Sequence, residues 1–207
     1  MVGMIVTVTS HKGGVGKTVT AVHLAGFFVQ EFGKGSTVLL DADPNASALE
    51  WAQRGIDNET PLPFPVVDPD AEPGDEEHVV VDSQGRLSGE DLEAAAEDSD
   101  LLVIPTTPEP MALNALMLLI DDLEELRRQA EYRVLLTMVP WWNRSGAAAR
   151  KELKAEGVPL FKGEIRRRQA FQDGSLAGVL VKDVNKRRAA QGWLDYEQVG
   201  REVIRRR

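Results

Sequence analysis

The sequence predicts an α/β fold in which a doubly wound, mostly parallel sheet is flanked by helices. Short runs of β-branched and other apolar residues alternate with longer segments that have the spacing of one helix face, and acids end the second and third runs. A glycine-rich turn joins the first run to the first helical segment. The 207 residues, 43% of them apolar, suffice for one core and are few for two, so we expect a single domain over residues 1–207.

The glycine-rich turn between residues 8 and 18 is typical of a phosphate-binding loop. Residues 4–8 have the composition of a buried strand, and residues 21–32 continue as a helix. Glycines let backbone N–H groups converge, and the start of the helix adds a partial positive charge. Lys17 would reach the β- and γ-phosphates of a nucleotide, and the Thr18 hydroxyl would bind Mg²⁺. A chance turn is disfavoured, because these two residues stand in the strand–turn–helix context that the motif requires.

A second lysine and a missing glycine indicate which class of phosphate-binding loop this turn resembles. The ordinary motif G-x-x-x-x-G-K-[ST] has glycine where this chain has His11, and Lys12 stands directly before Gly13 and Gly14. Residues 12–18 therefore resemble the deviant Walker A motif of the ParA/MinD class of P-loop ATPases, which have a SIMIBI-type fold. In that family the early lysine crosses a dimer interface to the partner's nucleotide. The resemblance implies an ATP-dependent homodimer with ATP and Mg²⁺ as cofactors, whereas a solvated surface lysine is the simpler alternative.

The resemblance also implies which residues of the loop carry the chemistry. Lys12 and Lys17 are the expected catalytic cations. Relatives often have a second threonine whose hydroxyl contacts the α-phosphate, whereas Val19 offers only its backbone N–H. The expected nucleotide-binding residues of the loop are Lys12, Gly13, Gly14, Val15, Gly16, Lys17, Thr18 and Val19.

Two acids follow the second apolar run. Residues 36–40 predict a strand, and Asp41 and Asp43 come next in a D-x-D-P sequence. Acids at the carboxyl end of a parallel strand lie where such sheets bind ligands. The sequence D-x-D-P resembles the second motif of the family, which implies that Asp43 orients or activates the attacking water and that Asp41 gives support near the metal. The alternative is an Asp-Pro turn that caps a helix, with Ser47 as another capping residue.

The third apolar run, residues 78–82, ends in an acid and resembles a Walker B strand. Asp82 would hold Mg²⁺ directly or through a water. Family members commonly continue with Asp-Thr-Pro-Pro, where this chain has Ser83-Gln84-Gly85-Arg86. Gln84 could hydrogen-bond a water or the γ-phosphate in a mobile segment, but we assign it no catalytic role. The expected metal ligands are Thr18, Asp41 and Asp82.

The loop over residues 140–144 also falls at the ligand-binding edge of the predicted sheet. Asn143 would read the adenine edge if it acts as a similarly placed asparagine does in relatives, and a capping or turn role is the alternative. Trp141 and Trp142 are expected to pack against the protein rather than to contact the adenine base.

The remaining segments are expected to continue the alternation of strands and helices. The apolar helix at 111–128 suits the core better than a subunit contact. The turn at 165–168 resembles a late I-x-x-R turn of the family, and the last helix opens at 186–190 and docks through Trp193, Leu194 and the apolar residues after them. The other expected elements are helices at 47–54, 90–97 and 147–156, strands at 101–104, 133–139 and 158–161, and a mostly irregular acidic tract at 55–77 with a short strand at 65–67.

Composition excludes several classes of site. The chain has no cysteine, which removes disulfides, thiolate metal sites, a cysteine nucleophile and the iron–sulfur members of this superfamily. No N-terminal stretch combines basic residues, an apolar run and a cleavage site, and no stretch has the length of a membrane span. We therefore expect a cytoplasmic protein with no membrane partner.

The net charge of −9 is distributed unevenly. Residues 55–77 hold eight acids and no lysine or arginine, whereas residues 144–207 hold sixteen basic residues against eight acids. A basic C-terminal third favours a local face for a polyanion such as DNA, although ordinary solvated helix surfaces would show the same pattern. Arg166, Arg167 and Arg168 form a second basic patch. The expected DNA-binding residues are Lys186, Arg187, Arg188, Arg201, Arg205, Arg206 and Arg207.

The resemblance is nearest to the short, ParF-like branch of the ParA partition ATPases. It implies a slow, Mg²⁺-dependent ATPase whose ATP-bound dimer binds non-specific DNA, associates with the nucleoid and segregates plasmid or chromosomal DNA. A ParB-like centromere-binding protein would stimulate hydrolysis. The main alternative is a MinD-like ATPase that positions protein machinery at a membrane. A P-loop enzyme acting on a small metabolite and a non-hydrolysing nucleotide-dependent scaffold are further alternatives.

Overall fold

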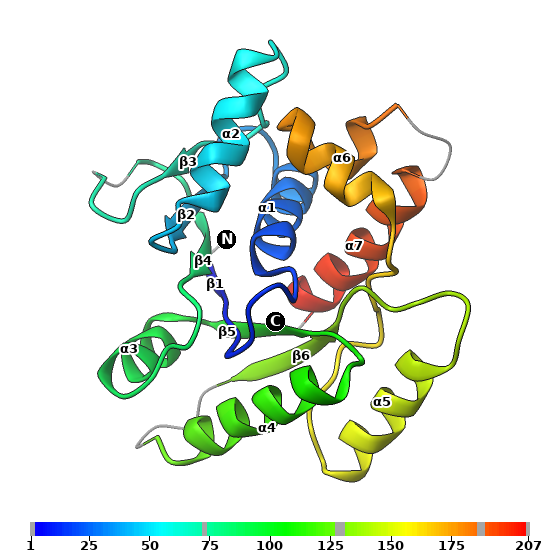
Figure 1. Cartoon of the computed structure of the whole chain (residues 1–207). Helices are drawn as coiled ribbons and strands as arrows, with labels where there is room; N and C mark the ends of the chain where they lie inside the picture. The colour runs from blue at the N-terminus through cyan, green and yellow to red at the C-terminus, as the bar shows by residue number, and fades with distance from the viewer. Residues whose placement is uncertain (1–2, 72–73, 127–130, 186–188, 206–207) are drawn as a thin grey trace.

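The computed structural model describes residues 3–71, 74–126, 131–185 and 189–205. Within these residues, six strands form one sheet in the order β3-β2-β4-β1-β5-β6, and every neighbouring pair is parallel (Figure 1). The chain therefore places β1 inside the sheet and adds strands on both sides of it, which is the doubly wound arrangement. The strands are β1 (Met4–Val8), β2 (Thr37–Ala42), β3 (Val66–Val67), β4 (His78–Ser83), β5 (Leu101–Thr106) and β6 (Tyr132–Leu136).

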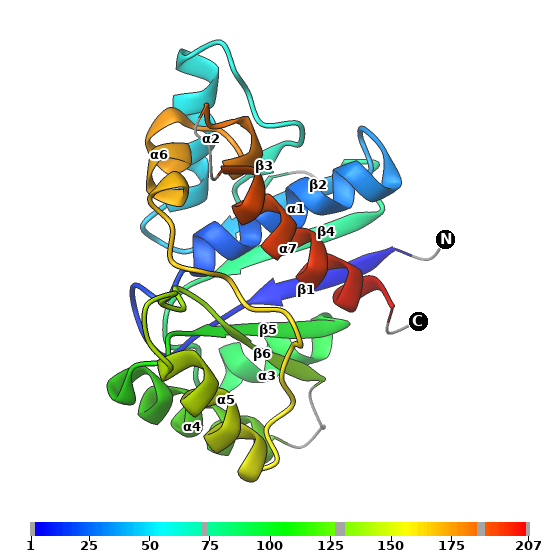
Figure 2. The same cartoon turned by 90° about the vertical axis from the view of Figure 1, so that its right-hand side faces the viewer.

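Helices lie on both faces of the sheet, over two separate clusters of buried side chains (Figures 1 and 2). One face carries α1 (Lys17–Phe32), α2 (Ser47–Asp57), α6 (Gln169–Ala177), the short helix η1 (Val181–Asp183) and α7 (Ala189–Ile204). The other carries α3 (Glu90–Asp98), α4 (Pro110–Glu124) and α5 (Ser145–Ala155). None of the helices in the described ranges is both long enough and apolar enough to cross a membrane.

The strand register brings the predicted site segments to one edge. Val8, the last residue of β1, pairs with Asp82 on β4, and Asp82 pairs with Asp41 on β2. Because all strands run in the same direction, the loops that follow them meet at this carboxyl edge. The glycine-rich turn and the predicted acids therefore share one side of the molecule.

Two expected boundaries were wrong. The predicted strand at 158–161 forms only an isolated bridge between Leu160 and Val134. The predicted strand at 133–139 ends at Leu136, because Met138 has φ of 49°, a left-handed conformation that a strand cannot contain. The short strand expected at 65–67 in the acidic tract is confirmed and is β3.

The helix expected at 111–128 packs in the core, as predicted, and ends at Glu124 within the described residues. Its buried side is part of the cluster beneath β5 and β6, while Met111 and Leu118 are exposed. In the last helix, Trp193, Tyr196, Val199 and Val203 are buried and Ile204 is partly buried, but Leu194 is exposed, which corrects its expected docking role. The expected start of this helix at residues 186–188 lies outside the described residues.

Candidate nucleotide site

The turn between β1 and α1 has the backbone geometry of an anion cradle. Gly14 and Gly16 have φ of 75° and 90°, which side chains other than glycine rarely adopt. A Cβ atom at Gly13 or Gly14 would meet nothing within 4 Å, so the hollow of the loop is open. No side chain caps the start of α1 at Gly16. The free N–H groups of a helix start can therefore face an anion in this hollow.

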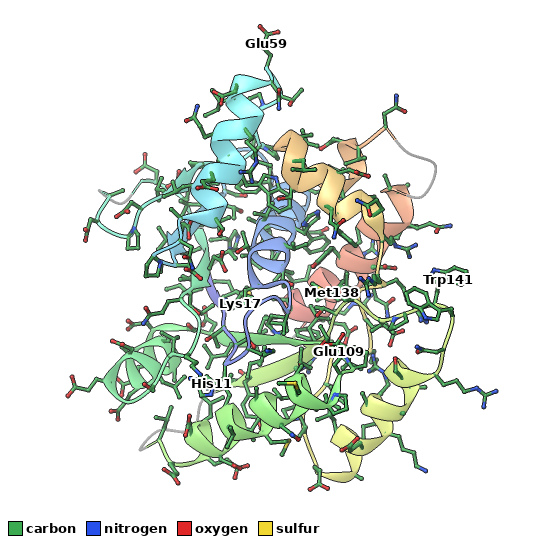
Figure 3. All side chains as sticks on the ribbon, viewed as in Figure 1. His11, Lys17, Glu59, Glu109, Met138 and Trp141 are labelled. Carbon is green, nitrogen blue, oxygen red and sulfur yellow. The ribbon has the colours of Figure 1, made fainter. Side chains whose placement is uncertain are left out.

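The two predicted phosphate-site groups Lys17 and Asp43 lie together in this structure. The Lys17 ammonium is 3.7 Å from Asp43 Oδ2, and both side chains are 11% exposed. The other oxygen of Asp43 accepts hydrogen bonds from the backbone and side-chain nitrogens of Asn45. The D-x-D-P turn thus directs one carboxylate oxygen at the lysine of the loop (Figure 3 shows Lys17).

Asp41 has a different environment from the one expected of a metal ligand. One of its oxygens accepts hydrogen bonds from the backbone N–H groups of Ala48 (2.8 Å) and Leu49 (2.9 Å), and the other accepts the N–H of Asp43 at 3.3 Å. Its carboxylate therefore satisfies the start of α2, as a helix-capping acid does. These hydrogen bonds join Asp41 both to the turn that carries Asp43 and to the start of α2.

Asp82 is fully buried, and neither of its carboxylate oxygens has a hydrogen-bond partner among the described residues. Burial raises the pKa of Asp82 to about 7, against the opposing effects of the Thr18 hydroxyl and the Lys17 ammonium. An unpaired carboxylate and a threonine hydroxyl beside a phosphate cradle are the donors that Mg²⁺ uses together with a nucleotide. No three acidic or histidine side chains in the described ranges gather around one point, so other ligands of such an ion would be phosphate and water.

The ammonium group of Lys12 makes no hydrogen bond or ion pair with any described residue. Its backbone N–H donates to the Ser10 hydroxyl at 3.2 Å, and the residue is partly exposed. The residue is therefore placed at the surface of the site, while Lys17 is directed inward.

Sequence reasoning missed the role of His11. Its Nε2 atom lies 2.8 Å from the Leu87 carbonyl oxygen and 3.7 Å from an Asp122 carboxylate oxygen on α4. The backbone N–H of Arg86 also donates to the Ser10 carbonyl, at 3.2 Å. A Cβ atom at Gly85 would lie 3.8 Å from the Lys17 ammonium. The segment after Asp82 is therefore tied to the entry of the glycine-rich turn and lies against it. The only signal in the sequence was a histidine where the motif has glycine.

A cavity of about 510 Å³ adjoins the cradle on the side of α6 and α7. It begins at Gly16 and Val19 and continues past Met138 and residues 165–168. Thr137, which also lines it, donates a hydrogen bond to the Val15 carbonyl at 2.7 Å and so holds the loop against β6. Its position next to the phosphate cradle suits the nucleoside of a bound nucleotide.

The loop over residues 140–144 stays outside this cavity. Asn143 is exposed, and its amide oxygen accepts hydrogen bonds from the backbone N–H and hydroxyl of Ser145, which matches the turn role. The expected packing of the two tryptophans was wrong, because Trp141 and Trp142 are 71% and 57% exposed and contact each other edge to face. Figure 3 shows Trp141 directed outward, away from Lys17.

The predicted basic residues do not form one patch. Arg166 and Arg168 are paired with Glu164 (2.9 Å) and Asp195 (3.1 Å), which removes them as free cations, while Arg167 is exposed. Arg201 and Arg205 are exposed and line an open cavity of about 460 Å³ that Glu202 also lines, and Arg201 is itself paired with Glu197 at 3.1 Å. Two basic residues that the sequence did not single out, Arg133 and Lys162, join them there. The predicted Lys186, Arg187, Arg188, Arg206 and Arg207 lie outside the described residues.

Comparison with known proteins agrees with this geometry. The model of the CobQ/CobB/MinD/ParA nucleotide binding domain matches residues 6–192. The chain is 33% identical to the maintenance of carboxysome distribution protein A of Gloeobacter kilaueensis, over 97% of this chain and 94% of that protein. It is 30% identical to the protein ParA of Rhizobium radiobacter, over 81% and 80%.

Among solved structures, a candidate plasmid partition protein of Borrelia burgdorferi B31 bound to AMPPNP superimposes with a TM-score of 0.79. The two chains are 18% identical, and the match covers 99% of this chain and 100% of the other. The fold and the deviant glycine-rich motif thus agree with the family model, and the chain belongs to the CobQ/CobB/MinD/ParA family of nucleotide-binding domains.

Proposed function

We propose that this protein is a positioning ATPase that dimerises on ATP, binds DNA non-specifically in that state and releases it after hydrolysis. The observation that carries the proposal is the phosphate cradle with two lysines, one directed inward beside Asp43 and the other left at the surface. A protein that only bound a nucleotide would need Lys17 alone. A partly exposed second lysine in the glycine-rich turn suits a contact supplied to another copy.

The chemistry is assigned to the residues around the cradle. The N–H groups at the start of α1 and Lys17 bind the β- and γ-phosphates, and the nucleoside enters the cavity beside Met138. Thr18 and Asp82 hold Mg²⁺, which neutralises charge on the phosphate oxygens when bound. Asp41 holds the turn that presents Asp43.

Hydrolysis requires an acceptor for the attacking water. Asp43 is paired with Lys17, and bound phosphates would compete for that lysine because they carry more charge. Asp43 is then free to accept a hydrogen bond from the water. Since this step depends on correct closure around the nucleotide, the intrinsic rate should be slow and open to stimulation by a partner protein.

DNA binding is assigned to the cavity lined by Arg133, Lys162, Arg201 and Arg205, together with the basic residues at 186–188 and 206–207. Contacts between these cations and DNA phosphates carry no sequence information, so binding should be non-specific and should weaken steeply with salt. This assignment enlarges the predicted set by two residues.

Two kinds of cargo fit this activity. A ParB-like centromere-binding partner would make the cargo plasmid or chromosomal DNA. A protein assembly is the second candidate, because the relative with 33% identity is named for carboxysome distribution. The membrane alternative is weaker, since α7 uses most of its apolar residues to pack against the cluster around α1.

The test is a gel shift with arbitrary duplex DNA, with and without ATP and at two salt concentrations. We expect a shift that requires ATP and is lost at the higher salt. The double variant Lys162→Ala/Arg205→Ala should weaken it, whereas Lys151→Ala/Lys154→Ala on the exposed side of α5 should not. A gel shift that depends on neither ATP nor the salt concentration would refute the proposal. Flotation of the protein with liposomes that requires ATP would favour the membrane alternative.

A further inference from the structure

One face of the sheet is only partly covered. On β2 and β4, every second residue is buried beneath α1, while the residues between them, among them Leu40, Val79 and Val81, remain partly exposed. On β1, Ile5 points to the same side and is 37% exposed. Parallel sheets are normally covered on both faces, and their strands are apolar on both sides for that reason. These strands have the apolar residues but lack a full cover.

The uncovered residues form the floor of a groove with a volume of about 590 Å³. Its wall is α3, which lies on the side of the sheet away from α1 and contributes Ala94 and Ala95 (Figure 1). At the carboxyl edge of the sheet the groove reaches Gln84 and Leu87. It is largely apolar along its length.

The wall of the groove is acidic. Asp91 and Asp98 line it, and none of the lysine or arginine residues that the structure describes does. Three further acids, Glu90, Glu93 and Glu97, lie on the same short helix, which has no basic residue. An apolar floor beside an acidic wall is complementary to a helix with an aliphatic stripe and basic flanks.

We propose that this groove docks a basic amphipathic helix of a partner protein. The aliphatic residues of that helix lie on Val79 and Val81, and its lysine or arginine residues face Asp91 and Asp98. A second copy of this chain would bring a second acidic wall against the first, and an anionic lipid surface would be repelled in the same way. Charge therefore selects a basic protein segment over these two occupants.

A helix in this groove also touches the segment that follows Asp82. Leu87, at the end of the groove, is the residue whose carbonyl oxygen is bonded by His11 of the glycine-rich turn. Docking and the nucleotide cradle are thereby connected through one hydrogen bond. The docking site itself does not depend on the proposed DNA-binding role, because it is defined without nucleotide or DNA.

The experiment is a selection from a phage-displayed library of helical peptides on the full-length protein without nucleotide. Leucine is fixed at positions i, i+3, i+4 and i+7, and the other positions encode lysine, glutamate or glutamine at equal frequency. We expect lysine to be enriched several-fold over glutamate. The best peptide, synthesised with a fluorophore, should bind at least tenfold more weakly to Ala94→Lys and to Asp91→Lys/Asp98→Lys.

The matched control is Ala148→Lys, which adds the same charge at an exposed alanine of α5 and should bind like the unmodified protein. Ala94 is exposed, so its replacement leaves the core intact, and circular dichroism checks this. Enrichment of glutamate, an absence of enriched helices, or equal binding by Ala94→Lys would overturn the proposal. So would self-association or binding to anionic vesicles that Ala94→Lys abolishes, because another occupant would then cover the groove.

Discussion

The ammonium group of Lys17 lies 3.7 Å from the carboxylate of Asp43. Both groups are mostly buried beside the phosphate cradle, and they neutralise each other there. A bound triphosphate offers the lysine a stronger partner, which would leave the carboxylate for water. The pair thus couples the arrival of phosphate to the release of the group proposed to orient the nucleophile.

Replacing Asp43 by asparagine should lower ATP turnover by about 10² or more, because the amide cannot accept a proton from the water. ATP binding should persist, so the variant should accumulate as an ATP-bound dimer. Phosphate release measures turnover, and light scattering after gel filtration in ATP measures the dimer. Asp57→Asn, at an exposed carboxylate of α2, is the control and should behave like the unmodified protein. Turnover within twofold of normal in Asp43→Asn would exclude the proposed role.

Lys12→Ala should separate nucleotide binding from dimerisation. The cradle and Lys17 remain, so we expect ATP affinity within about tenfold of normal, which is about 1.4 kcal/mol. The ATP-dependent dimer and turnover should be lost, since the variant has no cation at this position to reach a second subunit. Lys34→Ala removes another exposed lysine at the far end of α1 and should change neither property. A Lys12→Ala protein that dimerises and hydrolyses ATP normally would contradict the contact in trans.

His11 should restrain the segment after Asp82 in the absence of a nucleotide. Loss of its hydrogen bond to the Leu87 carbonyl in His11→Ala removes about 1 kcal/mol of local stability, or about a fivefold change in opening. Arg86 is exposed within this segment, so trypsin should cleave after it about fivefold faster. Cleavage after Lys34, measured in the same digest by mass spectrometry, should be unchanged. Equal rates after Arg86 would mean that His11 does not hold the segment.

The sequence was sufficient to predict the edge on which the site forms. Apolar runs separated by helices indicate a parallel sheet, and in such a sheet the groups that follow β1, β2 and β4 must meet. That argument predicted the convergence of Lys17, Asp43 and Asp82. It could not assign separate roles to Asp41 and Asp43 in the D-x-D-P sequence. The spacing of the two acids does not say which carboxylate will accept hydrogen bonds from the N–H groups at the start of α2. The structure gives that contact to Asp41.

Other features depend on contacts between distant parts of the chain. His11 and Leu87 are 76 positions apart, and neither lies in a pattern that signals their hydrogen bond. The exposure of Trp141 and Trp142 depends on how far their loop extends from the sheet, whereas their composition alone favours burial. Hydrophobicity predicts which strands are apolar on both faces, but not that a groove is left open over β2 and β4.

Gly200→Ala should destabilise the fold by about 1–3 kcal/mol through overpacking. A Cβ atom at this position of α7 would lie 2.2 Å from Phe27 Cδ1 on α1, and both residues are buried. The two helices can therefore approach this closely only with glycine at the contact. Urea unfolding measures the free energy, with Gln198→Ala on the exposed side of the same helix as the control. Unchanged stability of Gly200→Ala would show that α7 can move away from α1 without cost.

His23 should make the stability of the protein depend on pH. Burial lowers the pKa of His23 from 6.5 to about 4, with a smaller lowering by Lys182, and its Nδ1 atom donates to the Val19 carbonyl at 2.7 Å. Its Nε2 atom accepts the Val181 N–H at 3.0 Å, which requires the neutral ring. Above pH 6.5 both folded and unfolded states hold this histidine neutral, so it adds no pH dependence there. As pH falls from 6.5 to 4, only the unfolded state binds the proton, and stability should decrease by roughly 3 kcal/mol in total.

The variant His23→Gln lacks this titration and isolates its contribution. Its free energy of unfolding, measured in urea between pH 7 and pH 4, should fall less steeply than that of the unmodified protein, by roughly the same 3 kcal/mol over the window. The two proteins share all their other titrating groups. The difference between their slopes of unfolding free energy against pH is therefore due to His23. Parallel curves for His23→Gln and the unmodified protein would mean that the buried ring takes up its proton without unfolding the core.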